Sequence, residues 1–246
     1  MQLYLIRHGQ STNNALGEEQ DLRVHDPPLT EAGEQQAQLL AEYFKTRPNF
    51  DNYVVQPVDA SRRTEPAPFS FTHLYCSAMH RAMQTAKPIA AALEMDVEIW
   101  VDVHEFGGIF LNKDGVTTGY GGYTRQQIED EFTGYIIPET VTEQGWWKPE
   151  SGREEFGHGV ARALRVAKDL KDRAADKSRR DERIAIVAHG GFLDALLKTF
   201  QERIPASGYY QWLYNTSVTR LDFTPEGRIL FRYMNRVDHL PPELVT

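Results

Sequence analysis

Two histidines, two arginines and one glutamate follow apolar runs of the sequence, and side chains of these types could together transfer a phosphoryl group. They are Arg7, His8, Arg81, Glu105 and His189. An imidazole can attack phosphorus, and guanidinium groups can hold phosphate oxygens in bidentate fashion while they stay charged. Because the same cations disfavour protonation of a neighbouring imidazole, His8 is expected to stay neutral and nucleophilic at neutral pH.

Four apolar runs place these side chains at equivalent points of one sheet. Strands are expected over residues 3–6, 72–76, 97–101 and 183–188, and polar groups follow each of them. Ligands of open α/β sheets bind outside the carboxyl ends of the strands. A lone histidine at such a point is more often a loop residue than a nucleophile. The whole set, however, indicates one shared crevice.

The remaining periodicity predicts helices and a terminal hairpin. Thr30 is the expected N-cap of a helix of about 15 residues. Further helices are expected over residues 79–93, 155–174 and 192–200. Two strands, 218–223 and 229–233, flank a turn sequence and should form a hairpin. This order predicts an α/β fold, a three-layer α/β/α sandwich with a mostly parallel sheet and the hairpin at the sheet edge.

With 246 residues, the chain has the length of one large α/β domain, and a single domain over residues 1–246 is expected. Two stretches lack a regular spacing of apolar residues. Residues 46–71 are rich in proline and predict a surface insertion. Residues 106–152 mix glycines, aromatic residues and charges, contain a capping-box pattern at Thr124, and are expected to form a lid.

Composition excludes several classes of function. The formal net charge of −8 argues against a nucleic-acid-binding protein, which would carry a basic face. No apolar stretch approaches the roughly 18 residues of a membrane span, so no membrane partner is expected. The short apolar run at residues 3–6 does not read as a signal peptide, and the single cysteine, Cys76, cannot form an internal disulfide. A cytoplasmic protein is therefore expected.

Metal and nucleotide chemistries fit the sequence poorly. Acid–histidine neighbours occur at 25–26, 104–105 and 238–239, but none has a zinc-site spacing such as H-E-x-x-H. Neither G-x-x-x-x-G-K-[ST] nor a strand-end G-x-G-x-x-G is present. Four residues separate Cys76 from Arg81, one fewer than in the cysteine-dependent phosphatase loop, so Cys76 is expected to be structural. An enzyme without metal or cofactor is predicted.

Four segments resemble, in the same order, the motifs of the histidine phosphatase superfamily, the phosphoglycerate-mutase-like family. They are residues 5–14 (LIRHGQSTNN), 26–33 (DPPLTEAG), 76–86 (CSAMHRAMQTA) and 186–191 (IVAHGG). The resemblance spans almost the whole chain. It implies that His8 accepts the phosphoryl group in a covalent phosphohistidine, in two in-line displacements. The other phosphate-binding residues that it implies are Arg7, Asn14, Arg81, His189 and Gly190.

The resemblance makes Glu105 the proton donor to the departing alcohol. The sequence around it keeps an acid followed by glycine but departs from the fuller family pattern. His104 and Asp102 therefore remain alternative donors.

The acceptor of the phosphoryl group is water in a phosphatase and a second alcohol in a mutase. A mutase needs extra cations near the site, and the expected lid is net acidic and lacks an adjacent arginine pair. Arg62 and Arg63 of the insertion could reach inward. We expect a phosphatase acting on a small phosphorylated metabolite. The alternative is a mutase, which alone would need 2,3-bisphosphoglycerate.

A third possibility is an inactive relative that binds a partner through the aromatic residues of the expected lid. These are Phe110, Tyr120, Tyr123, Trp146 and Trp147. The intact set around His8 argues against it. The terminal hairpin offers an edge at which copies of the chain could pair, but no sequence signature decides the oligomeric state.

Overall fold

The computed structural model describes residues 1–17, 20–49, 67–205 and 208–246. Their main sheet has seven strands in the order β11-β10-β1-β9-β4-β5-β8. The strands are β1 Gln2–Arg7, β4 His73–Cys76, β5 Val97–Ile99, β8 Tyr135–Ile136, β9 Arg183–Ala188, β10 Val218–Phe223 and β11 Ile229–Arg236. The five strands from β1 to β8 in this order pair in parallel, and β10 and β11 add an antiparallel hairpin at the edge. The predicted mostly parallel sheet is confirmed.

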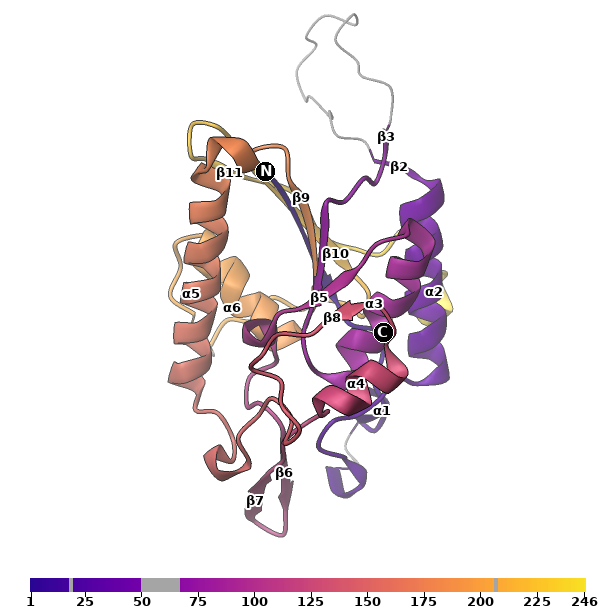
Figure 1. The fold of residues 1–246 in the computed structure, drawn as a ribbon, viewed down its shortest axis with the longest axis vertical. Helices are drawn as coiled ribbons and strands as arrows, with labels where there is room; N and C mark the ends of the chain where they lie inside the picture. The colour runs from indigo at the N-terminus through magenta and orange to yellow at the C-terminus, as the bar shows by residue number, and fades with distance from the viewer. Residues whose placement is uncertain (18–19, 50–66, 206–207) are drawn as a thin grey trace, which may run out of the picture.

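Helices cover both faces of the sheet (Figure 1). On one face lie α2 Glu31–Thr46 and α3 His80–Leu93, and on the other lie α5 Phe156–Ala175 and α6 Gly190–Phe200. Two shorter helices, α1 Thr12–Ala15 and α4 Arg125–Glu131, lie near the end of the sheet where β1 finishes. The three-layer α/β/α sandwich is therefore confirmed. No helix among the described residues is long and apolar enough to cross a membrane.

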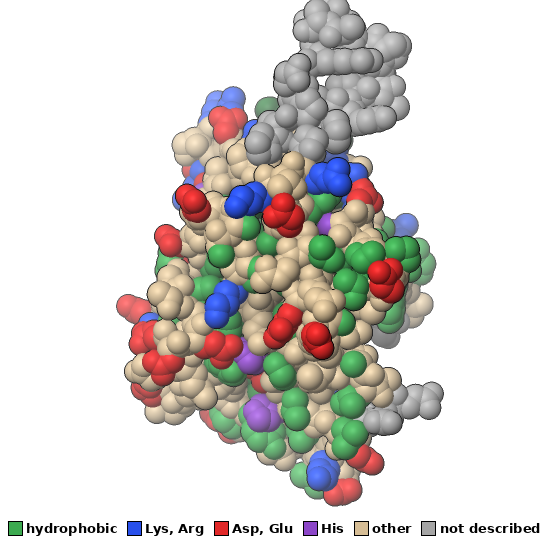
Figure 2. All heavy atoms as spheres, turned by 90° about the vertical axis from the view of Figure 1, so that its right-hand side faces the viewer, with side chains coloured by type: hydrophobic (Ala, Val, Ile, Leu, Met, Phe, Trp, Pro, Cys, Tyr) green, Lys and Arg blue, Asp and Glu red, His purple; other side chains and the backbone are tan. Residues whose placement is uncertain are grey.

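The alternation of side chains along β1 explains the two layers of core. Tyr4 and Ile6 are buried against α2 and α3, whereas Leu3 and Leu5 are buried against α5 and α6. Successive residues of a strand point to opposite faces, so a strand that is apolar throughout must be covered on both sides. The outer face of α2 and α3 carries interspersed acidic and basic side chains (Figure 2).

The third strand is shorter than predicted. The sequence predicts a strand over 97–101, but β5 ends at Ile99 and the chain turns into a 3-10 helix, η3, at Val101–Val103. The Trp100 amide still donates to the Cys76 carbonyl at 2.8 Å, which keeps the chain beside β4 as it leaves the sheet. The turn brings Glu105 to the end of the neighbouring strands.

The lid expected over 106–152 is not confirmed. This segment begins with the hairpin β6 Phe110–Lys113 and β7 Val116–Gly119, continues through α4, whose predicted capping box is present, and then supplies the edge strand β8. Ile109, Ile128, Phe132, Val141 and Trp146 of this segment are buried in the core against α3. Much of the segment therefore belongs to the core of the sandwich.

The predicted proline-rich insertion falls mostly outside the described residues, and so do Arg62 and Arg63. Its two ends pair as the short strands β2 Pro48–Asn49 and β3 Ala67–Pro68.

Two glycines let the loop after β1 lie directly against α2. A Cβ built on Gly9 would meet the Gly33 carbonyl oxygen at 2.6 Å, and one built on Gly33 would meet the Gln10 carbonyl oxygen at 2.1 Å. Thr30 caps α2 as predicted, because its Oγ1 accepts from the Gly33 amide at 3.0 Å. The loop that carries His8 is thus held against the first turn of α2.

We expect Gly33→Ala to destabilise the protein, because neither backbone segment can yield without moving the loop after β1. Overpacking of this kind costs about 1–3 kcal/mol, and for a chain of this size each kcal/mol lowers the melting temperature by about 2–4 °C. Thermal unfolding followed by circular dichroism measures the shift. Gly157→Ala in α5, where a Cβ would meet nothing within 4 Å, is the control. Equal melting temperatures for the two variants would contradict the close packing.

Candidate active site

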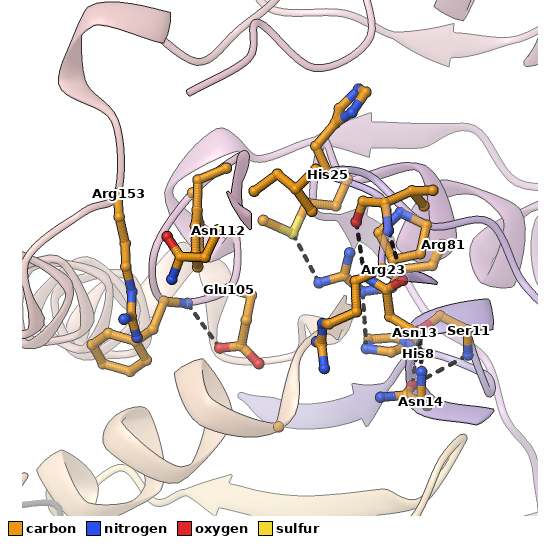
Figure 3. Close-up of a pocket in the computed structure, with 18 of the residues that line it drawn as sticks. His8, Ser11, Asn13, Asn14, Arg23, His25, Arg81, Glu105, Asn112 and Arg153 are labelled. Carbon is orange, nitrogen blue, oxygen red and sulfur yellow. Dashed lines mark hydrogen bonds between the residues drawn. The ribbon is translucent and has the colours of Figure 1, made fainter. Parts of the chain in front are cut away.

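A cavity of about 570 Å³ opens where β1, β4 and β9 end (Figure 3). Six of the seven predicted site residues line it: Arg7, His8, Asn14, Arg81, Glu105 and Gly190. They come from segments far apart in the chain, and the carboxyl ends of the parallel strands bring them together. The seventh, His189, is fully buried and does not line the cavity.

His8 is held in one tautomer by its two neighbours. Its Nδ1 lies 2.6 Å from the Gly9 carbonyl oxygen, and its Nε2 lies 3.1 Å from Nε of Arg81. Because a carbonyl oxygen only accepts, the proton belongs on Nδ1, and Nε2 keeps its lone pair. The atom that could attack phosphorus therefore faces the guanidinium that could hold the phosphate.

Burial, with the charges of Arg81 and Arg7, holds the pKa of His8 well below its usual value. The side chain is almost fully buried, and a charged imidazolium there would lose solvation beside two cations. His8 is thus neutral at neutral pH, as the sequence predicts.

The ring of His189 packs against the ring of His8, with 5.0 Å between centroids and 54° between planes. It is fully buried at the end of β9, and neither ring nitrogen has a hydrogen-bond partner among the described residues. Burial and the charge of Arg81 hold its pKa well below the usual value too. The phosphate contact that the resemblance implies for His189 stays a prediction.

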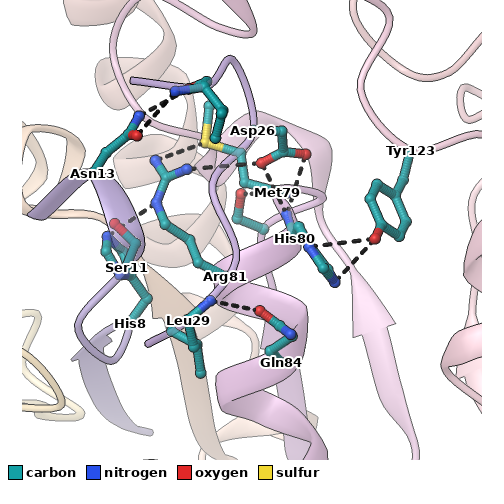
Figure 4. A network of polar contacts seen from close by, with 12 residues as sticks. His8, Ser11, Asn13, Asp26, Leu29, Met79, His80, Arg81, Gln84 and Tyr123 are labelled. Carbon is teal, nitrogen blue, oxygen red and sulfur yellow. Dashed lines mark hydrogen bonds and ion pairs between the residues drawn. The ribbon is translucent and has the colours of Figure 1, made fainter. Parts of the chain in front are cut away.

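Arg81, at the start of α3, is anchored on the side away from His8. Its Nη1 lies 3.8 Å from the buried carboxylate of Asp26, and its Nη2 lies 3.1 Å from Sδ of Met79 (Figure 4). The Asp26 carboxylate also accepts from the backbone amide of His80 at 3.2 Å. Asp26 therefore fixes the direction of Arg81, a role that sequence reasoning missed because it weighed Asp26 only as part of a longer motif and as a metal ligand.

Glu105 caps α6 with its side chain. Its carboxylate accepts backbone N–H bonds from Phe106 at 2.8 Å, Gly191 at 3.0 Å and Phe192 at 2.8 Å. A carboxylate is stabilised at a helix N-terminus, where backbone amides are free to donate. These three hydrogen bonds hold the side chain at the wall of the cavity.

The two alternative proton donors, His104 and Asp102, do not line this cavity. His104 is buried, with Nδ1 2.6 Å from the Val101 carbonyl oxygen and Nε2 3.7 Å from the Glu154 carboxylate. The geometry therefore favours Glu105 among the three acids considered.

The side chain of Asn14 forms hydrogen bonds within the turn that follows the His8 loop. Its Oδ1 accepts from the Ser11 amide at 3.2 Å and hydroxyl at 3.0 Å, which closes the capping box of α1. Both residues line the cavity.

Several lining residues were not identified from the sequence. Arg23, Asn112, Arg153 and Tyr210 all contribute to the wall. Arg153 lies just after the segment 106–152, and Arg23 gave no signal because it lies in an irregular stretch before α2.

Cys76 is fully buried in the core at the end of β4, and burial raises the pKa of its thiol. A protonated, enclosed thiol is a poor nucleophile. Among the described residues, no three His, Cys, Asp or Glu side chains gather as metal ligands would.

Comparison with known families matches the model of the histidine phosphatase superfamily (branch 1) to residues 3–66 and 58–236. Among curated proteins, one similar relative is a probable phosphoglycerate mutase GpmB from Enterobacter sp. (strain 638). It is 28% identical over 230 residues, with 91% of this chain and 85% of the relative covered.

Solved structures share the fold at low identity. The alpha-ribazole phosphatase from Shigella flexneri has a TM-score of 0.60 and 20% identity, over 96% of this chain and 97% of that chain. The phosphoserine phosphatase from Entamoeba histolytica, solved with 3-phosphoglyceric acid, has a TM-score of 0.57 and 22% identity, over 98% and 99% of the two chains.

The electrostatics of the site predict that His8 titrates well below its ordinary pKa. Replacing Arg81 with Gln should raise the His8 pKa, because one of the two flanking cations is lost while the burial remains. NMR of ¹⁵N-labelled imidazole rings over a pH series measures this directly. Arg165→Gln, exposed on α5, should leave the titration in place. A His8 that titrates at its usual value in the unaltered protein would contradict the geometry.

Proposed function

The chain belongs to the histidine phosphatase superfamily, and we propose that it is a phosphomonoester hydrolase working through a covalent phosphohistidine on His8. The observation that carries this proposal is the contact between Nε of Arg81 and Nε2 of His8, 3.1 Å apart at the wall of a cationic cavity. It combines a neutral nucleophile with a fixed cation. The substrate class is a small phosphorylated metabolite.

In the first step Nε2 of His8 attacks phosphorus in line with the ester oxygen. The P–O bond to the alcohol breaks as the N–P bond forms, and the departing oxygen takes a proton from the Glu105 carboxyl group. Arg7 and Arg81 balance the charge on the phosphoryl oxygens throughout. Burial keeps His8 neutral, so its lone pair is available without prior loss of a proton.

In the second step Glu105 removes a proton from water, whose oxygen attacks phosphorus and releases His8. Water can reach the site, since Arg23 and Arg153 on the wall of the cavity are exposed to solvent. Each step only forms and breaks bonds to phosphorus and to protons. We propose that it needs neither metal nor cofactor.

A mutase is the second candidate. The curated relative named above is a probable phosphoglycerate mutase, and the cavity holds cations beyond those next to His8. The acidic residues that made the segment 106–152 net negative do not line the cavity, whereas Arg153 just after it does. The charge of the segment is thus a poor guide to the charge of the site.

The remaining expectations from the sequence stay proposals. We propose a cytoplasmic enzyme whose partner is its small substrate, with no nucleic acid or membrane involved. The inactive alternative is disfavoured because Arg7, His8, Arg81 and Glu105 are all present at one cavity.

The proposed intermediate predicts phosphate release from p-nitrophenyl phosphate without added bisphosphoglycerate. Quenching turnover in alkaline denaturant should trap a base-stable, acid-labile phosphoryl label on the protein, which mass spectrometry locates. His8→Ala should abolish both label and turnover, whereas Cys76→Ser should retain both. A label that survives His8→Ala would refute the assignment, and strict dependence on bisphosphoglycerate would favour the mutase.

Glu105→Gln should slow hydrolysis of alkyl phosphates about 10²–10⁴-fold, the usual contribution of general acid–base catalysis. The loss should be much smaller for the first step with p-nitrophenyl phosphate, whose leaving group needs no proton. Glutamine keeps the shape of the side chain and can still accept from the amides of α6. Rapid-quench and steady-state assays separate the two effects, and Glu150→Gln, exposed away from the cavity, is the control. If substitution of His104 alone gave this leaving-group dependence, the donor would be misassigned.

A further inference from the structure

A buried ion pair packs against the loop that carries Glu105. Its members are Arg162, in the second turn of α5, and Glu154, just before that helix, and only 3% and 8% of their side chains are exposed. Nη2 of Arg162 lies 2.7 Å from Oε2 of Glu154, and Nε lies 3.1 Å from Oε1. The pair is therefore bidentate, the most specific geometry between a guanidinium and a carboxylate.

The remaining nitrogen of the guanidinium binds the backbone directly before Glu105. Nη1 of Arg162 donates to the Asp102 carbonyl at 2.8 Å and to the His104 carbonyl at 2.7 Å. The His104 carbonyl belongs to the peptide bond that joins His104 to Glu105. Arg162 thus fixes the point at which the chain enters Glu105.

The chain after Glu105 is held by the other member of the pair. The backbone amide of Glu154 donates to the Gly107 carbonyl at 2.9 Å. The ring of Phe106, between these two points, packs closely on α5, since a Cβ built on Gly159 would meet Cδ1 and Cε1 of that ring at 2.1 Å. The backbone is therefore held on both sides of Glu105.

The carboxylate of Glu105 has separate partners at the wall of the cavity (Figure 3). Two of the amides that donate to it, those of Gly191 and Phe192, belong to α6, whereas Arg162 belongs to α5. A proton donor must stay within hydrogen-bond reach of the oxygen that it protonates, and a misplacement of about 1 Å can cost about a hundredfold in rate. Contacts to the backbone and to the carboxylate together keep Glu105 in place.

The ionic character of the pair suits this task better than it suits stability. Burial raises the pKa of the Glu154 carboxyl group, but the contacts with His104 and Arg162 lower it to about 2, so the carboxylate is ionised at neutral pH. A buried ion pair is often no more stabilising than apolar side chains of the same volume. A guanidinium, however, can bind a carboxylate and two backbone carbonyls at once, which an apolar side chain cannot.

We propose that Arg162 and Glu154 are positioning residues, which hold Glu105 where it can exchange a proton with the ester oxygen. This inference rests on the proposed hydrolysis at His8 and extends it to residues outside the cavity. Neither side chain lines the cavity. Both act on the reaction through the backbone on either side of Glu105.

The test replaces both partners together, because the loss of one alone would leave the other charge buried and unpaired. In the variant with Arg162→Met and Glu154→Gln, kcat for ethyl phosphate should fall about tenfold to a hundredfold. KM should change little, since the groups around His8 remain. The first step with p-nitrophenyl phosphate, whose leaving group needs no proton, should also change little. Rapid-quench and steady-state assays measure both rates.

The matched control is a second ion pair of α5, between Arg173 and Glu182, which does not line the cavity. Replacing it with Arg173→Met and Glu182→Gln should lower the melting temperature without changing the ratio of the two rates. A ratio that also stays unchanged in the Arg162 and Glu154 variant, or equal slowing of both substrates, indicates a structural role alone and overturns the inference.

Combination with Glu105→Gln separates positioning from a general loss of structure. If the pair acts through Glu105, its replacement in the Glu105→Gln protein should slow ethyl phosphate hydrolysis little further, because coupled residues are not additive. A further loss of about tenfold or more in that protein would show that the pair acts on another group, and it would reject the proposed positioning.

Amide exchange separates this inference from the proposed function, because it needs no turnover. The amides of Gly191 and Phe192 should exchange with deuterium about tenfold faster in the Arg162 and Glu154 variant than in the control. Faster exchange in a protein that hydrolyses no phosphomonoester supports the hold on Glu105 and rejects the proposed function. Unchanged exchange and an unchanged rate ratio, alongside hydrolysis by the unaltered protein, reject the positioning role and leave the proposed function standing.

Discussion

The contact between a buried guanidinium and a buried neutral imidazole, Arg81 to His8, is the constraint on which the site depends. A charged imidazolium at this place would be desolvated beside two cations, so the pKa of His8 is held well below its usual value. The Gly9 carbonyl then selects the tautomer with the lone pair on Nε2. The same packing thus positions the proposed nucleophile and the proposed phosphate-binding cation before any substrate arrives.

Strands and helices together hold His8 and Arg81 in this contact. His8 directly follows β1, the strand at which the parallel part of the sheet meets the antiparallel hairpin, and Arg81 extends from the first turn of α3, where Asp26 holds it. The close approach of Gly9 and Gly33 presses the His8 loop onto α2. Glu105 reaches the same wall by leaving β5 through a 3-10 turn and capping α6. Each of these side chains is thus held by a strand or helix that is itself stabilised by burial of its other residues in the core.

The predictable part of the site is the part fixed by strand ends. His8, Arg81, Glu105 and Gly190 could be placed together because parallel strands finish at one edge of the sheet. Segments without a regular hydrophobic period are harder to predict. β8 has only two residues, too short for any alternation, so the sequence does not show that it belongs to the sheet. Arg23 and Arg153 come to the cavity through loop contacts that no local pattern encodes.

The central claim is that the cavity accepts a tetrahedral anion with phosphorus in line with Nε2 of His8. A crystal structure of the protein with orthovanadate tests this most directly, because vanadate mimics the five-coordinate transition state of phosphoryl transfer. The account predicts vanadium bonded to Nε2 of His8, with Arg7 and Arg81 on its equatorial oxygens and Glu105 beside an apical oxygen. Vanadate bonded to another side chain, or a cavity that stays free of vanadate at saturating concentration, would contradict it.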